Sequence, residues 1–188
     1  MPVQVQYTGQ PNIERPVGVK QAVWTKIIDL GMQPDKFHPG KFKHQLIIIW
    51  QLSDTYVWEG KNTRMQHAAF VSNSINSEKS TLHKYMVGTL GAEVFSKPWP
   101  AAMTLDDMLI GKNCMLSLSK KIEKKDGIEK VYSQIDAVAP LMSGLSEITI
   151  DPTVPVPSWI DEYIKGYKQA RIDASAPIVD LGAVLKAV

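Results

Sequence analysis

The sequence has a single cysteine, Cys114, among its 188 residues. One cysteine cannot close a disulfide within the chain or build a metal site made of cysteines alone. No apolar run approaches the roughly 20 residues that cross a membrane as a helix. Residues 1–16 also lack the apolar core of a secretory signal. These absences argue against a disulfide-stabilised scaffold and a membrane protein, and they predict a soluble protein of the cytoplasm.

The residue spacings that carry common enzyme chemistry are also missing. The histidines at positions 38, 44, 67 and 83 form no HxH, HExxH or Cys-His pattern. The sequence contains no GxSxG motif, phosphate-binding loop or glycine-rich dinucleotide turn. Asp106 and Asp107 would point apart on a helix and fit a helix start, and Cys114 has the apolar neighbours of a buried side chain. We therefore expect no catalytic residue, no metal and no cofactor, and we do not expect an enzyme.

The sequence also lacks a large excess of charge of either sign. Its 21 basic residues nearly balance its 19 acidic residues, and the net charge is +2. Bulk charge therefore does not indicate a nucleic-acid-binding protein. A nearly neutral protein can still carry a basic groove if its charges cluster locally. Residues 112–130 contain six lysines against three acids, so this segment is predicted to form a basic surface.

Strand-like patterns dominate the hydrophobic residues. The predicted strands are residues 18–30, 43–52, 63–72, 112–122 and 129–138. Residues 31–40 are expected to form a turn, and residues 53–62 a hairpin loop. Trp50 shares a strand face with Leu46 and Ile48 and is expected in the core.

One amphipathic helix is predicted between the third and fourth strands. Its apolar residues recur at helical spacing from Leu82 to Leu90, Ser77 is the expected cap, and Gly91 is the expected end. A short second helix is expected over residues 104–110, where Thr104 and Asp107 match a loose capping box. The order β-β-β-α-β-β is that of the OB-fold. The predicted fold is therefore mainly β with helices (α+β), a five-stranded, partly open Greek-key barrel with a helix between strands 3 and 4.

Three parts are expected along the chain: an N-terminal arm at residues 1–15, the OB-fold domain at 16–150, and residues 151–188. The last part begins with alternating prolines that favour an extended linker. Residues 158–171 then have acids in the first turn and bases near the end, which suits the helix dipole. This C-terminal helix is expected to pack on the barrel or on a second subunit, which would make a homo-oligomer.

Aromatic and basic residues lie together where an OB-fold would bind a single strand. Such proteins hold phosphates in a basic groove and stack bases on aromatic rings. The candidate nucleic-acid-binding residues are Trp24, Lys26, Tyr56, Trp58, Lys61, Arg64, Lys120, Lys121, Lys124, Lys125 and Tyr132. Each has a structural alternative: Trp24 fits the core as well as the surface, and the lysines could belong to an ordinary solvated hairpin.

Four short motifs resemble a family of phage-encoded single-stranded-DNA-binding proteins. They are D-L-G at residues 29–31, E-K-S-x-L-x-K at 78–84, L-I-G-K at 109–112 and V-A-P-L at 138–141. The likeness covers about residues 16–145. It implies an OB-fold protein that coats exposed single strands during replication or recombination of phage DNA, in the cytoplasm of the infected cell. That family often ends in an acidic tail, which this sequence lacks.

The sequence therefore favours a single-stranded DNA-binding protein with little sequence preference. The alternative is an oligomeric replication or recombination accessory protein that binds protein partners rather than DNA. DNA and RNA are not distinguished by these residues, because that choice depends on contacts to the 2′-hydroxyl.

Overall fold

The computed structural model describes residues 15–35, 38–58, 60–125 and 128–173. The chain divides between Val154 and Pro155 into two compact units. The predicted N-terminal arm lies outside the described residues, apart from Arg15.

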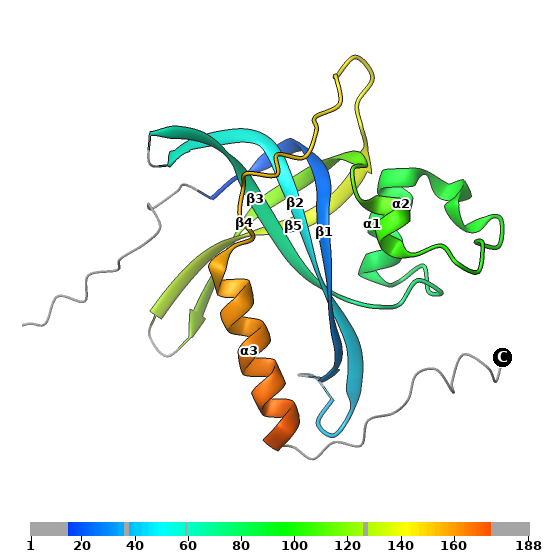
Figure 1. The fold of residues 1–188 in the computed structure, drawn as a ribbon, viewed down its shortest axis with the longest axis vertical. Coiled ribbons are helices and arrows are strands. Elements are labelled where there is room, and N and C mark those ends of the chain that lie inside the picture. Colours follow the sequence, from blue (N-terminus) through cyan, green and yellow to red (C-terminus); the bar gives the residue numbers. More distant parts are fainter. Residues whose placement is uncertain (1–14, 36–37, 59, 126–127, 174–188) are drawn as a thin grey trace, which may run out of the picture. The chain divides into compact units, whose positions relative to one another are not determined.

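The first unit is built on one antiparallel sheet (Figure 1). Its strands are β1 (Gly18–Pro34), β2 (Phe42–Trp58), β3 (Lys61–Ser72), β4 (Asn113–Lys125) and β5 (Ile128–Pro140). Their order in the sheet is β3-β2-β1-β4-β5. The long strand β1 lies at the centre, because it pairs with β2 from Ala22 onward and with β4 before Trp24. Five antiparallel strands with a few helices confirm the predicted α+β class.

The strands are longer than the sequence pattern predicted. β1 continues through residues 31–34, which were expected to turn, and β2 and β3 continue almost to Gly60 through most of the expected hairpin loop. Shifts in register explain this length. They fall between Trp24 and Lys26 and between Asp29 and Gly31 on β1, and after Gln51 on β2. Bulges of this kind let a long strand bend while it stays paired with its neighbours.

Helix α1 (Thr81–Leu90) follows β3 and begins later than expected. The cap is Ser80, whose hydroxyl accepts a hydrogen bond of 3.1 Å from the His83 amide, so the prediction of Ser77 is wrong. The predicted end is confirmed, because Gly91 has a φ of 93° and donates its amide to the Val87 carbonyl.

Two short helices complete the crossover to β4. The 3-10 helix η1 (Ala92–Phe95) directly follows α1. The second, α2 (Leu105–Leu109), has the predicted capping box, in which Thr104 and Asp107 satisfy each other's main-chain amides. Hydrogen bonds from Thr104 hold the pKa of the Asp107 carboxyl below its ordinary value, so this acid serves the start of the helix.

The core lies between one face of the sheet and α1. Trp50 is fully buried, as predicted, and its ring lies 4.7 Å from that of Trp24 and 5.7 Å from that of Tyr85. The contact with Tyr85 is edge-to-face, which is a favourable arrangement for aromatic pairs. The indole nitrogen of Trp24 donates to the Thr89 hydroxyl at 3.0 Å, so the helix and the sheet are joined by a polar contact within the core.

His67 on β3 lies beside Trp50, with ring centroids 6.4 Å apart. Burial, and secondarily the charge of Arg15, lowers the pKa of His67 from 6.5 to about 4. The unfolded chain therefore binds a proton between these pH values that the folded chain does not. Stability from this group is fully present above about pH 6.5 and is lost as the pH falls toward 4.

We expect this loss to reach roughly 3 kcal/mol at pH 4, since each pKa unit corresponds to about 1.4 kcal/mol. Urea unfolding at several pH values measures it. The His67→Phe variant is the control, because it keeps a ring beside Trp50 and cannot titrate. Equal pH dependence of the wild type and the variant between pH 6.5 and 4 would refute the assignment.

The second unit contains helix α3 (Ser158–Asp173). This confirms the helix predicted from residue 158 and extends it by two residues. No helix in the described part of the chain is long and apolar enough to span a membrane.

Candidate nucleic-acid interface

Cross-strand pairing assigns each strand residue to one of two sheet faces. We call the face that carries Trp50, Leu116 and Leu118 the inner face, because these side chains are buried in the core against α1. The opposite face, which carries Gln51 and Met115, is the outer face. Side chains alternate along a strand, and directly paired residues share a face. The register therefore shows which candidate residues lie together.

Two hairpin ends extend beyond the pairing with β1. β4 pairs with β1 as far as Leu118, and β2 pairs with β1 as far as Leu52. Beyond these points lie the β2–β3 arm (residues 55–64) and the β4–β5 arm (residues 119–134), each made of two strands. In Figure 1 both arms project to the left, away from α1 and α2. The sheet thus presents two exposed arms on the side away from these helices.

The β2–β3 arm carries a tyrosine and a lysine on its inner face. Met65 on β3 packs against the core, and alternation from it places Thr63 and Lys61 on the same face. Tyr56 pairs with Thr63 and so shares this face, where it is half-buried. The main chain of Trp58 pairs with Lys61, but its side chain is not among those the structure describes.

The β4–β5 arm separates neighbouring lysines onto opposite faces. Lys120 and Ile122 follow Leu118 on the inner face, and Val131 pairs with Ile122 there. Lys121 lies on the outer face with its partner Tyr132. The candidate lysines around this hairpin therefore do not form a single patch. Lys125 belongs to β4 by its main chain, and its side chain is not described.

The outer face of this arm is occupied by internal contacts. The Lys121 ammonium lies 3.4 Å from the Glu123 carboxylate and 5.6 Å from the centre of the Tyr132 ring. Tyr132 donates its hydroxyl proton to Glu123. Hydrogen bonds with Tyr132 and then with Glu123 raise the pKa of Lys121. The charge and the ring predicted to bind nucleic acid here contact each other.

The inner face has fewer such contacts. Lys124 lies 3.7 Å from Glu129 in an exposed pair, which contributes little to stability. Lys61 and Lys120 are exposed, and neither forms an ion pair with a carboxylate that the structure describes. These two lysines carry charges that a phosphate could reach.

A segment after β5 crosses the outer face of the sheet. We call residues 146–151 the strap. The Gln51 side chain bonds both the amide and the carbonyl of Asp151 at 2.8 Å, and Asn113 does the same for Ile148 at 2.9 and 3.0 Å. Both amide side chains are buried. The strap was missed in the sequence because it is held through its own main-chain groups, which leave no residue pattern.

Two further side chains fix the strap. The Arg64 guanidinium donates to the Thr149 carbonyl at 2.9 Å, and Gln21 donates to the Ser146 carbonyl at 2.7 Å. Arg64, predicted to hold a phosphate, therefore already has a main-chain partner on the outer face. Lys26 also lies on the outer face, since it pairs with Ile49 on β2, and it is exposed.

The structure corrects the prediction made for Trp24. Its side chain is fully buried against Trp50 and its indole N–H is bonded to Thr89. A ring enclosed on both faces cannot stack on a base, so the prediction of a nucleic-acid contact at Trp24 is wrong. The prediction relied on Trp24 and Lys26 lying close together on one strand. A register shift between them places the tryptophan on the inner face and the lysine on the outer face.

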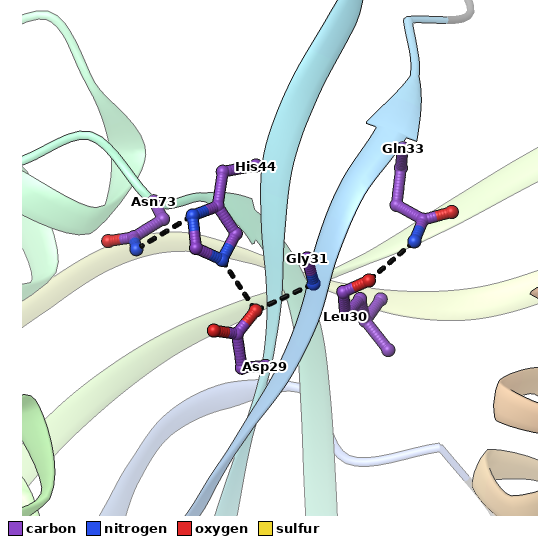
Figure 2. A network of polar contacts seen from close by, with 6 residues as sticks. All are labelled: Asp29, Leu30, Gly31, Gln33, His44 and Asn73. Atoms are coloured by element: carbon purple, nitrogen blue, oxygen red, sulfur yellow. Dashed lines mark hydrogen bonds and ion pairs between the residues drawn. The ribbon is translucent and has the colours of Figure 1, made fainter. Parts of the chain in front are cut away.

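A separate polar network lies where β1 and β2 meet the chain after β3 (Figure 2). The Asp29 carboxylate accepts hydrogen bonds from the Gly31 amide at 2.6 Å and from the His44 ring at 2.5 Å. Gly31 has a φ of 64° and lies at a shift in register. The D-L-G motif is thus a bulge whose glycine adopts a positive φ and whose aspartate caps the turned amide.

His44 in this network has no ring nitrogen left for proton transfer. Its Nε2 faces Asp29, and its Nδ1 lies 3.3 Å from the side-chain nitrogen of Asn73, which can only donate (Figure 2). Nδ1 therefore accepts a hydrogen bond from Asn73, and the N–H at Nε2 donates a hydrogen bond to Asp29. A general base needs an unoccupied nitrogen near its substrate. Both ring nitrogens of His44 are hydrogen-bonded, so its contacts favour a structural role, in which it links β2 to β1, over a role as a base.

Cys114 is buried in β4, and burial raises the pKa of its thiol to about 12. A thiol with such a pKa supplies almost no thiolate near neutral pH, and the thiolate is the reactive form. No group of three or more histidine, cysteine, aspartate or glutamate side chains within the described ranges could hold a metal ion.

No protein-family model matches the chain, and no curated protein matches it. The two arms, their exposed lysines and the strap are therefore the features of the structure that bear on function.

Proposed function

We propose that this protein binds single-stranded DNA with little sequence preference during replication or recombination of phage DNA, in the cytoplasm of the host cell. We further propose that its sheet is an OB-fold barrel. The strand order β3-β2-β1-β4-β5, with α1 between β3 and β4, supports this because an OB-fold has the same chain order and pairs its first strand with β2 and β4.

The observation that carries the proposal is the pair of exposed arms. Each extends beyond the β1 pairing and carries an exposed lysine on its inner face: Lys61, which shares that face with Tyr56, on one arm, and Lys120 on the other. Phosphates need cations, whereas bases of any sequence can stack on an aromatic ring. Lysines and aromatic rings on projecting arms suit a ligand that is long, anionic and variable in sequence.

Fluorescence anisotropy of a labelled oligo-dT strand tests this function. We expect saturable binding at about 50 mM salt that weakens steeply by about 200 mM, because each neutralised phosphate releases counterions. Unlabelled single strands of other sequence should compete nearly as well as oligo-dT, and duplex DNA should compete poorly.

The control is the same titration with dextran sulfate as competitor, which is a polyanion but has no bases to stack. Absence of binding at low salt, or equal competition by the base-free polyanion, would contradict the proposal. The protein-binding alternative would then be favoured.

A further inference from the structure

The outer face of the sheet is closed beside both arms. The strap bonds to Asn113 on β4, Gln51 on β2 and Arg64 on β3, so it crosses the sheet from β4 to the edge strand β3. Gln51 and Asn113 are buried beneath it and each makes two hydrogen bonds to it. Lifting the strap would break these paired contacts. In the structure a ligand therefore finds the face beside both arms already covered.

The inner face of the arms has the opposite character. Ile122 and Val131 form a cross-strand pair that is 54% and 37% exposed, which is unusual for directly paired apolar residues. Lys120 precedes Ile122 by two residues on the same face. An apolar pair beside a lysine offers contacts to a base or a sugar and to the adjoining phosphate.

A third cation lies between the two arms. The Ser133 hydroxyl on the inner face of β5 donates to the Pro16 carbonyl at 2.7 Å. The preceding residue, Arg15, is exposed, yet lies close enough to His67 on β3 to contribute to lowering its pKa. Pro16 thus contacts β5 on its inner face, and the charge of the neighbouring Arg15 acts on His67 of β3. The inner side carries Lys61 on one arm, Lys120 on the other and Arg15 between them.

We infer that the single strand runs along the inner face, from the β2–β3 arm past Arg15 to the β4–β5 arm, and not across the outer face. This inference rests on the proposed function and names its site. Lys61, Arg15 and Lys120 contact phosphates, and the exposed pair Ile122 and Val131 contacts bases or sugars. The outer-face candidates Lys26, Arg64, Lys121 and Tyr132 lie outside this path.

Ile122 and Val131 were not among the residues predicted from the sequence. Their exposure follows from the length of the arm, because β4 pairs with β1 only as far as Leu118 and beyond it pairs with β5 alone. The alternation of β4 alone would have placed Ile122 in line with the buried Leu118 and so in the core.

Adjacent lysines on opposite faces provide the test. Lys120→Gln removes an inner-face charge and Lys121→Gln removes an outer-face charge one residue away. Lys61→Gln and Lys26→Gln form a second matched pair of exposed lysines. All four variants change the net charge equally, so nonspecific attraction to a polyanion should fall equally in all of them. Oligo-dT anisotropy is measured with the full chain over a series of salt concentrations.

We expect Lys120→Gln and Lys61→Gln to weaken binding several-fold and to lower the salt slope by about 0.7, the value for one phosphate contact on a single strand. Lys121→Gln and Lys26→Gln should stay within about twofold of the wild type. Equal losses in all four variants, no loss in any, or larger losses in the outer-face variants would each overturn the inference. If the wild type itself fails to bind, the proposed function fails first.

Discussion

Replacing Trp24 with alanine is expected to destabilise the protein by about 3–5 kcal/mol, the range for removing a large buried aromatic side chain. The Trp24 ring is fully buried, packs on Trp50, and holds Thr89 of α1 through its indole nitrogen. The substitution would leave a cavity at the junction of helix and sheet. Urea unfolding followed by circular dichroism measures the change.

The conservative variant Trp24→Phe separates stability from binding. It fills most of the cavity but loses the hydrogen bond to Thr89, so we expect a smaller loss of about 1–2 kcal/mol and unchanged affinity for oligo-dT. A Trp24→Phe protein that is as stable as the wild type but no longer binds DNA would contradict the placement of this residue in the core.

Gly88 to alanine is expected to cost about 2–3 kcal/mol, although alanine is the better helix former by about 1 kcal/mol. A Cβ atom at residue 88 would lie 2.2 Å from the carbonyl oxygen of Val138 and 2.7 Å from its carbon. These are main-chain atoms of β5 and cannot rotate away. The helix must therefore move off the strand to make room for the methyl group.

Lys84→Ala is the matched control, because Lys84 is exposed on the same helix. We expect it to change the free energy of unfolding by no more than about 0.5 kcal/mol. Thermal and urea unfolding of both variants give the comparison. If Gly88→Ala proves as stable as Lys84→Ala, α1 does not pack against β5 as closely as described.

The element order could be read from the sequence because alternation and helical spacing are local signals. The lengths of the strands could not be read from the sequence in this way. The pairing of residues 55–58 with 61–64 resumes only after a shift in register behind Gln51, and polar residues there resemble a loop. Ser77 and Ser80 are both plausible caps by residue type. Ser80 is the cap in the structure, where its hydroxyl also donates to the Ser74 carbonyl.

The candidate site was only partly accessible from the sequence, since composition finds cations and aromatic rings but not the faces they occupy. Lys120 and Lys121 are equivalent as letters, yet cross-strand pairing places them on opposite faces. Trp24 was misplaced for the same reason, because a bulge follows it. The contact of Arg64 with the strap depends on a main-chain carbonyl 85 residues away, which no local pattern encodes.

The central claim, binding of single strands by stacking and phosphate contacts, is tested most directly by intrinsic tryptophan fluorescence during titration with oligo-dT. Two of the five tryptophans, Trp24 and Trp50, are fully buried, so any quenching by bases should come from the others. We expect saturable quenching at low salt that reverses at high salt and is mostly lost in Trp58→Phe. Unchanged fluorescence of the wild type at every salt concentration would contradict the account.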